Sequence, residues 1–298
     1  MDAALLARLD ALLALLQRFE PLLPPPTLPT DWSALAYRWC RRDYLGGARG
    51  RLEPVSRIAR IEAGDLQHIE RQKQALLANT AQFVRGLPAN NALLTGARGT
   101  GKSSLIRACL AAYAQDGLRL IEVDKRDLVD LPDIVGCVAA RPERFIVFCD
   151  DLSFEEGEGG YKALKAALDG SVAAAGDNVL IYATSNRRHL MPEFMRENLD
   201  TRYQDDGEIH PGETVEEKVS LSERFGLWLS FQPFRQDDYL SIVGHWLRHY
   251  GLTDAQIDQA RTEALQFALQ RGSRSGRVAL QFARDHAGRL AQQRAAGA

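Results

Sequence analysis

The sequence reads Gly96-Ala97-Arg98-Gly99-Thr100-Gly101-Lys102-Ser103 at the point where a short apolar run ends and a helical pattern begins. This stretch fits the phosphate-binding pattern G-x-x-x-x-G-K-[ST], which is informative when it lies between a strand and a helix. Its glycines let the backbone N–H groups turn inward, and the following helix directs the positive end of its dipole at the same point. The stretch therefore predicts a loop that surrounds the phosphates of a nucleotide.

The chemistry of the side chains assigns a role to each part of this loop. Lys102 is expected to contact the β and γ phosphates, and the hydroxyl of Ser103 is expected to bind Mg²⁺. ATP and Mg²⁺ are therefore the predicted cofactors. The predicted nucleotide-binding residues of the loop and the start of its helix are Gly96, Ala97, Arg98, Gly99, Thr100, Gly101, Lys102, Ser103 and Ser104.

A second apolar run, at 145–149, ends in Asp150 and Asp151. A carboxylate at the end of a buried strand loses hydration, and a neighbouring cation offsets that cost. We therefore expect Asp150 to bind Mg²⁺ through water, and Asp151 to orient or deprotonate an attacking water. Glu155 and Glu156 are alternative bases, although a glycine-rich acidic stretch of this kind is usually a solvated loop.

Five short apolar runs predict buried strands, because each is rich in β-branched or aromatic residues. They lie at 92–95, 118–123, 145–149, 179–184 and 227–232. Helical patterns fill most of the gaps, and this alternation predicts an α/β fold with a parallel sheet between two helical layers. The segment 205–223 contains Gly, Pro and many acids and indicates a long exposed loop. Residues 237–290 are helical in pattern throughout and predict a small helical subdomain.

The chain before the first of these strands has three parts. Leucines at 5, 6, 9, 12, 13 and 16 predict an amphipathic helix over 3–19, and prolines between 21 and 29 predict an extended linker. Residues 32–60 carry more arginines than acids, interleaved with aromatic residues, a composition compatible with nucleic acid or an acidic partner. We favour a solvated arm that packs its aromatics on the main domain. The expected domains are 1–53, the N-terminal helix, linker and basic arm; 54–234, the nucleotide-binding α/β domain; and 235–298, a helical lid.

Composition narrows the class of protein. With 298 residues, 45% hydrophobic and 26% charged, the chain has the balance of a globular protein, and a net charge of −2 argues against nonspecific coating of polyanions. The four cysteines lie far apart, so neither a zinc site nor a disulfide framework is indicated. The leucine-rich start is interrupted by Arg8 and Asp10 and is too short to cross a bilayer. We expect a cytoplasmic protein without a membrane anchor.

Motifs of two other nucleotide-binding classes are missing from the sequence. Asp124-Lys125-Arg126-Asp127 resembles the guanine-reading N-K-x-D only loosely and comes too early, and no LSGGQ occurs. The order of motifs instead resembles the AAA+ superfamily of P-loop ATPases. In that resemblance, Asn186 is sensor 1, with Thr184 as second choice, and Arg224 within Ser-Glu-Arg-Phe-Gly is the arginine that enters the ATP site of an adjacent subunit.

The same resemblance implies further features. Arg277 is the choice for sensor 2 of the lid, ahead of Arg274 in the preceding loop, and Ile69 is the choice for an adenine contact. The AAA+ resemblance also implies a five-stranded sheet in the order 51432 and assembly into a homo-oligomer. A closer resemblance, over most of residues 54–290, is to a bacterial AAA+ family with no assigned cellular task, on motifs such as Phe-Cys-Asp-Asp-Leu-Ser-Phe-Glu-Glu from Phe148 and Ala-Thr-Ser-Asn-Arg-Arg from Ala183.

These assignments lead to three functional hypotheses. Most AAA+ hydrolases have glutamate where this chain has Asp151, which implies a slow ATPase, and the stretch 125–136 lacks the aromatic of polypeptide-threading machines. The favoured hypothesis is an ATPase switch that loads or remodels a macromolecular partner. A non-hydrolysing ATP-binding scaffold and a nucleic-acid-associated loader are the alternatives. His245 and His249 share one helical face, but no third ligand accompanies them, so we do not expect a zinc site.

Overall fold

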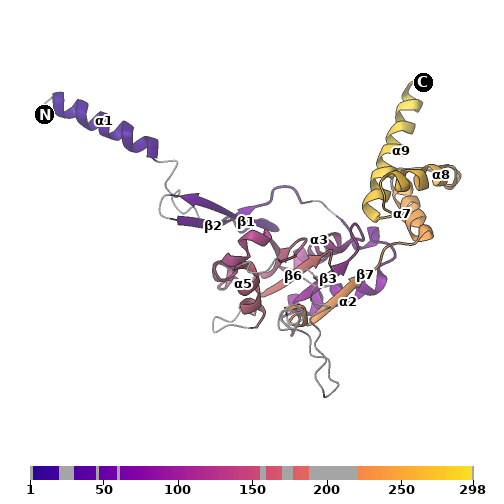
Figure 1. Ribbon diagram of the computed structural model, residues 1–298, viewed down its shortest axis with the longest axis horizontal. Helices are drawn as coiled ribbons and strands as arrows, with labels where there is room; N and C mark the ends of the chain where they lie inside the picture. Colours follow the sequence, from indigo (N-terminus) through magenta and orange to yellow (C-terminus); the bar gives the residue numbers. More distant parts are fainter. Residues whose placement is uncertain are drawn as a thin grey trace, which may run out of the picture.

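The structure is a computed structural model that describes residues 3–19, 30–44, 47–58, 61–154, 159–169, 177–187 and 221–296. The predicted linker, the alternative bases Glu155 and Glu156, and nearly all of the predicted loop at 205–223 lie outside these residues. A twisted sheet forms the centre of the molecule, with helices on both of its faces (Figure 1).

All five predicted strands are present, within two residues of the predicted bounds. They are β3 (Ala92–Gly96), β4 (Leu118–Glu122), β5 (Arg144–Cys149), β6 (Val179–Ser185) and β7 (Leu227–Phe231). These strands pair in parallel as β4-β5-β6-β3-β7. Numbered along the chain, this is the order 51432, so that part of the fold prediction is confirmed. Every residue of β6 is buried, because helices cover both faces of a parallel sheet.

The predicted total of five strands is wrong, because the sheet formed by the described residues has seven strands and is mixed. Strand β1 (Ala36–Tyr44) pairs in parallel with β4, and β2 (Gly47–Pro54) pairs antiparallel with β1. The sequence predicts a solvated arm here, whereas the structure shows two strands of the sheet. The predicted inward packing of the aromatics is present, since Tyr37 and Trp39 are buried in the core. Arginines on the other positions of the strand are exposed, and these hid the strand pattern.

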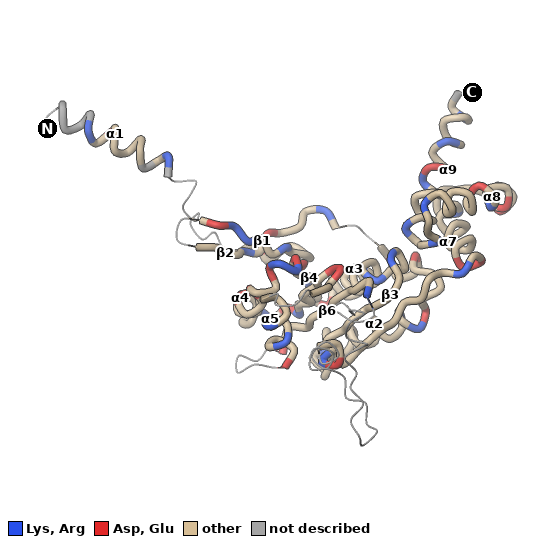
Figure 2. The backbone as a smooth tube through the Cα atoms, in the orientation of Figure 1, with Lys and Arg blue, Asp and Glu red and all other residues tan. Residues whose placement is uncertain are grey.

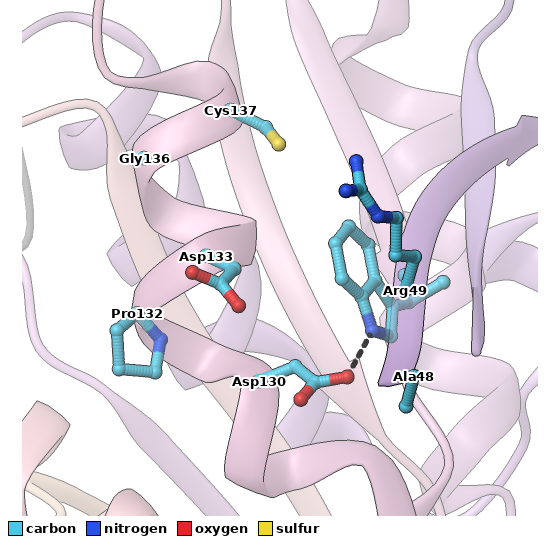
Figure 3. A pocket seen from close by; sticks show the side chains of 9 residues that line it. Ala48, Arg49, Asp130, Pro132, Asp133, Gly136 and Cys137 are labelled. Carbon is cyan, nitrogen blue, oxygen red and sulfur yellow. Dashed lines mark hydrogen bonds between the residues drawn. The ribbon is translucent and has the colours of Figure 1, made fainter. Parts of the chain in front are cut away.

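Long-range polar contacts fasten this hairpin to the main body. Trp39 Nε1 donates a hydrogen bond of 3.0 Å to Asp130 Oδ2, the dashed line at Asp130 in Figure 3. Arg41 pairs with the other oxygen of that carboxylate at 3.1 Å. Arg38 pairs with Glu122 on β4. The arginines of the hairpin stand out as basic segments in Figure 2, yet these pairs show that part of their charge is already neutralised within the chain.

Gly50 of β2 permits close packing on the Trp39 ring, and this gives a test of the hairpin. A Cβ added at Gly50 would lie 1.9 Å from the ring, whereas one added at Gly64 would meet nothing within 4 Å. We expect Gly50→Ala to destabilise the protein by ~1–3 kcal/mol through overpacking. Thermal unfolding measures this, with Gly64→Ala as the control. Equal melting temperatures for both variants would show that the hairpin does not pack as described.

Helices make up the outer two layers and bury one apolar face each. On one face of the sheet, α2 (Glu70–Val84) and α3 (Lys102–Tyr113) contribute Leu76 and Leu105 to a core cluster. On the other face, α4 (Leu131–Val138) and α5 (Gly159–Leu168) contribute Ile134 and Leu164. Short 3₁₀ segments lie at η2 (Ala63–Asp65), η3 (Ala114–Asp116) and η4 (Lys125–Asp130).

The predicted helical region after β7 consists of α7 (Gln236–His249), α8 (Asp254–Gln270) and α9 (Gly276–Ala296). These helices have their own core cluster, in which Tyr239, Ala264 and Phe282 are fully buried. The Tyr239 hydroxyl donates to the carbonyl oxygen of Ala264 and satisfies a polar group that would otherwise be buried alone.

The predicted N-terminal helix is α1 (Ala3–Phe19), and Figure 1 shows it apart from the sheet. Its side chains Leu9, Leu12, Leu13 and Leu15 are 50–57% exposed. Within the described part of the chain, no helix has the length and apolar character needed to cross a membrane.

Candidate phosphate-binding site

The site lies where three neighbouring parallel strands end. Strand β3 ends at Gly96, β5 at Cys149 and β6 at Ser185, and β6 pairs with both of the other two. Because parallel strands have their carboxyl ends at the same edge, the residues that follow them converge there. The glycine-rich loop follows β3, Asp150 and Asp151 follow β5, and Asn186 follows β6.

The glycine-rich loop has a backbone that suits glycine. Gly96, Gly99 and Gly101 have φ values of +125°, +71° and +101°, in the region that residues with a Cβ rarely adopt. At Gly96 an added Cβ would also lie 2.0 Å from the carbonyl oxygen of Phe231. Helix α3 starts directly after the loop, at Lys102. The loop therefore combines a curled backbone with a helix N-terminus, the two features that bind phosphate.

Lys102 lies inside this curl, with 6% of its surface exposed. Its Nζ donates to the carbonyl oxygens of Gly96 and Ala97, at 2.8 and 2.7 Å, and to Asn186 Oδ1 at 3.1 Å. Burial lowers the pKa of Lys102, while the carboxylates of Asp150 and Asp151 act in the opposite direction. The ammonium therefore joins the loop to the end of β6.

A hydroxyl and a carboxylate meet beside the lysine. Ser103 Oγ donates to Asp150 Oδ1 at 2.6 Å, and Thr184 Oγ1 donates to the same oxygen at 2.6 Å. Ser103 and Asp150 are the two residues predicted to hold Mg²⁺, and the structure brings them into direct contact. A hydroxyl together with a carboxylate is an oxygen donor set that suits this hard cation.

Asp151 has an unusual backbone conformation, and its carboxylate is hydrogen-bonded to Asn186. Its φ of 53° places a residue with a Cβ in the left-handed region. Its Oδ1 accepts a hydrogen bond of 2.5 Å from Asn186 Nδ2. Since Asn186 also contacts Lys102, the predicted base, sensor 1 and phosphate-binding lysine form one connected chain. Asp151 and Asn186 were assigned from separate motifs, and the structure places them in contact.

The lid touches the loop at its tip. The N–H of Gly276, at the start of α9, donates to the carbonyl oxygen of Gly99 at 2.9 Å. A Cβ added at Gly99 would lie 2.7 Å from the Ser275 side chain and 3.6 Å from Cβ of Arg277. The positive charges of Arg98 and Arg277 also lower the pKa of Lys102, after burial. Arg277 is therefore near the loop, while Arg274 and Arg98 line a cleft of about 620 Å³ between loop and lid.

Of the predicted site residues, Arg224 lies away from the phosphate loop and Ile69 is buried beside it. The guanidinium of Arg224 pairs with the Asp169 carboxylate just after α5, and Arg224 precedes the start of β7, at the edge of the sheet opposite the phosphate loop. Ile69 is 4% exposed and packs beside the loop, its Cδ1 3.5 Å from where a Cβ on Gly101 would be. Ser104 lies half-buried in the first turn of α3.

Some contacts at the site were not expected from the sequence. The partners Asp169 of Arg224 and Ser275 of Gly99 carry no motif that identifies them. Ser275 does have a local signal, because its Oγ accepts from the N–H of Val278, as a helix-capping serine does. Thr184 is the second choice for sensor 1, but the sequence does not predict its contacts with the Asp150 carboxylate and the Asp151 N–H.

Among the described residues, no group of three or more His, Cys, Asp or Glu side chains could hold a metal ion. Of the discounted histidine pair, His245 contacts Asp65 at 3.3 Å. A separate pocket of about 520 Å³ lies between the β1–β2 hairpin and α4, with Arg49, Asp133 and Cys137 on its walls (Figure 3). None of the predicted site residues lines it.

Comparison with known proteins places these features in a family. The family described as "Protein of unknown function (DUF815)" matches residues 33–290. No curated protein matches the chain. Among solved structures, the AAA domain of FIGL-1 in complex with ADP matches with a TM-score of 0.50 and 18% identity, covering 78% of this chain and 74% of that one.

Two further structures have lower scores. A RuvB mutant from Thermotoga maritima matches with a TM-score of 0.46 and 16% identity, over 76% of this chain and 62% of that one. A HORMA:CdnC:Trip13 complex from E. coli MS115-1 matches with a TM-score of 0.48 and 12% identity, over 76% and 93%. At these identities the likeness is one of fold. By its sequence the chain belongs to the DUF815 family, and its fold is that of the AAA+ P-loop ATPases.

Proposed function

We propose that this chain binds Mg²⁺-ATP and hydrolyses it slowly, as an AAA+ ATPase that switches conformation to load or remodel a macromolecular partner. The observation that carries the proposal is the convergence of Lys102, Ser103, Asp150, Asp151 and Asn186 at one edge of the sheet. These residues supply a cation, a hydroxyl, two carboxylates and an amide, which together fit a metal-bound triphosphate.

Each residue has a role that its contacts support. Lys102 and the loop N–H groups would hold the phosphates, and Ser103 with Asp150 would hold Mg²⁺. The metal would supply charge neutralisation on the β and γ phosphates. Asn186, which donates to Asp151 Oδ1, would keep that carboxylate oriented toward the attacking water.

The slow rate follows from the length of Asp151. Its side chain is one methylene shorter than glutamate, and misplacing a catalytic group by about 1 Å can cost about a hundredfold in rate. The left-handed backbone and the hydrogen bond from Asn186 hold the short carboxylate in one position, which supports activity that is low rather than absent.

The lid gives the proposed switch a physical path. The Gly276 N–H bonds to the carbonyl oxygen of Gly99, in the loop whose N–H groups are proposed to receive phosphate. Phosphate binding and lid position would thus act on one short backbone segment. We further propose that the protein forms a homo-oligomer, because the role assigned to Arg224 requires an adjacent subunit. A cytoplasmic location and a protein partner complete the proposal.

The nucleic-acid hypothesis receives no separate support. Four arginines of the hairpin form ion pairs with carboxylates of the chain itself: Arg38, Arg41, Arg42 and Arg51. Deletion of residues 32–51, which would test an arm, would here remove most of two strands of the sheet. Salt-dependent binding would have to be tested with arginine substitutions instead.

Asp151→Asn tests the proposed base. Asparagine retains an oxygen to accept from Asn186 but cannot take a proton, so we expect hydrolysis to fall about a hundredfold while ATP affinity is retained. Single-turnover assays with labelled ATP and calorimetry measure the two quantities, with the exposed Asp116→Asn as the control. Wild-type protein that never cleaves its bound ATP would identify the scaffold alternative.

A partner of the ATP state should be captured by Asp151→Asn and released by the wild type during turnover.

A further inference from the structure

Thr184 joins the ends of β5 and β6 through a single side chain. The residue is 1% exposed. Its hydroxyl donates to Asp150 Oδ1 at 2.6 Å and accepts the backbone N–H of Asp151 at 3.0 Å. One hydroxyl group therefore contacts both carboxylate-bearing residues, using its one proton and one of its lone pairs.

The backbone of Thr184 holds the same turn. Its carbonyl oxygen accepts the N–H of Leu152 at 2.6 Å. Asp151, which lies between Asp150 and Leu152, has the left-handed φ of 53°. This conformation is strained for a residue with a Cβ and persists only where its surroundings impose it. The hydrogen bonds from Asp151 and Leu152 to Thr184 are such a constraint.

We propose that Thr184 is a positioning residue that sets both the metal-binding carboxylate and the water-orienting carboxylate. This inference rests on the proposed function and gives Thr184, the second choice for sensor 1, a role different from that of Asn186. Asp150 Oδ1 accepts two hydroxyl donors, from Ser103 and Thr184, and this fixes the rotation of its carboxylate. The hydrogen bond from the Asp151 N–H to Thr184 Oγ1 fixes the backbone position from which the Asp151 carboxylate extends.

Two substitutions separate this role from packing alone. Thr184→Val preserves the shape of the side chain but removes both the donor to Asp150 and the acceptor for the Asp151 N–H. Thr184→Ser keeps the hydroxyl and loses one methyl group. If Thr184 only fills space, the valine variant should be the more active of the two. If its hydroxyl positions the carboxylates, the serine variant should be the more active.

The kinetic test compares wild type, Thr184→Val and Thr184→Ser by phosphate release over a range of Mg²⁺ concentrations. For valine we expect kcat to fall about a hundredfold, the scale of an ångström-level misplacement, with a higher Mg²⁺ midpoint and little change in KM for ATP. For serine we expect near wild-type kcat and Mg²⁺ midpoint. A valine variant with wild-type kcat and Mg²⁺ midpoint would overturn the proposal, as would equal losses in both variants.

A second measurement needs no nucleotide and so separates this inference from the proposed function. Hydrogen–deuterium exchange of the free protein reports on the N–H groups of Asp151 and Leu152. We expect faster exchange in a peptide covering 150–154 for valine but not for serine, with β7 unchanged in both. Wild-type protein without ATPase activity would refute the proposed function alone, whereas unchanged exchange in the valine variant would refute the role of Thr184.

Discussion

Lys102→Ala is expected to reduce ATP hydrolysis by at least about a hundredfold, because a buried cation directed at developing phosphate charge contributes on that scale. Lys102 is 6% exposed, and its ammonium is held by two loop carbonyls and Asn186, so it is already positioned before nucleotide binds. Alanine removes the charge and these three contacts together. Phosphate release at saturating ATP measures the loss of rate, and calorimetry measures the loss of affinity.

The matched control for this prediction is Lys162→Ala. Lys162 is an exposed lysine on α5, so its removal changes the net charge equally without touching the loop. Melting temperatures establish that both variants are folded. A folded Lys102→Ala protein with wild-type hydrolysis would refute the assignment of the phosphate site.

The central sheet was predictable because its strands are buried on both faces. Such strands are short apolar runs, and β5 and β6 have no exposed residue in the structure. The β1–β2 hairpin has one solvated side, and two of its arginines, Arg38 and Arg41, pair with Glu122 and Asp130, which lie more than 80 positions away along the chain. Charge pairs between such distant segments leave no local pattern, and the sequence alone therefore predicts an arm rather than two strands.

The same distinction applies to the site. Asp150, Asp151 and Asn186 could be grouped from sequence, because residues after parallel strands share one edge of the sheet. The roles given to them stay predictions, although the contacts of Lys102 and Asn186 support them. The contact of Gly276 with Gly99 depends on how the lid is oriented on the sheet. No periodicity or motif in the sequence predicts that orientation, so this contact could not be expected from the sequence.

Arg224→Ala is expected to reduce hydrolysis strongly, and only in the assembled protein. Arg224 precedes β7, whereas the phosphate loop follows the parallel neighbour β3. The two therefore lie at opposite edges of the sheet, separated by a five-residue strand, or about 16 Å at 3.3 Å per residue. Within one chain Arg224 pairs with Asp169. If its guanidinium acts on the transferred phosphoryl group, it must do so in an adjacent subunit.

Mixing two inactive variants tests this directly. Lys102→Ala subunits keep Arg224, and Arg224→Ala subunits keep an intact phosphate loop. In a random equal mixture of a cyclic homo-oligomer, about one interface in four combines an intact loop with an intact arginine, so activity should return to about a quarter of wild type. Arg261→Ala, which removes an exposed arginine of α8 paired with Asp258, is the control and should retain full activity. Mixtures that assemble normally yet stay inactive would contradict action between subunits, and Arg224→Ala protein with full activity would remove the arginine from the site altogether.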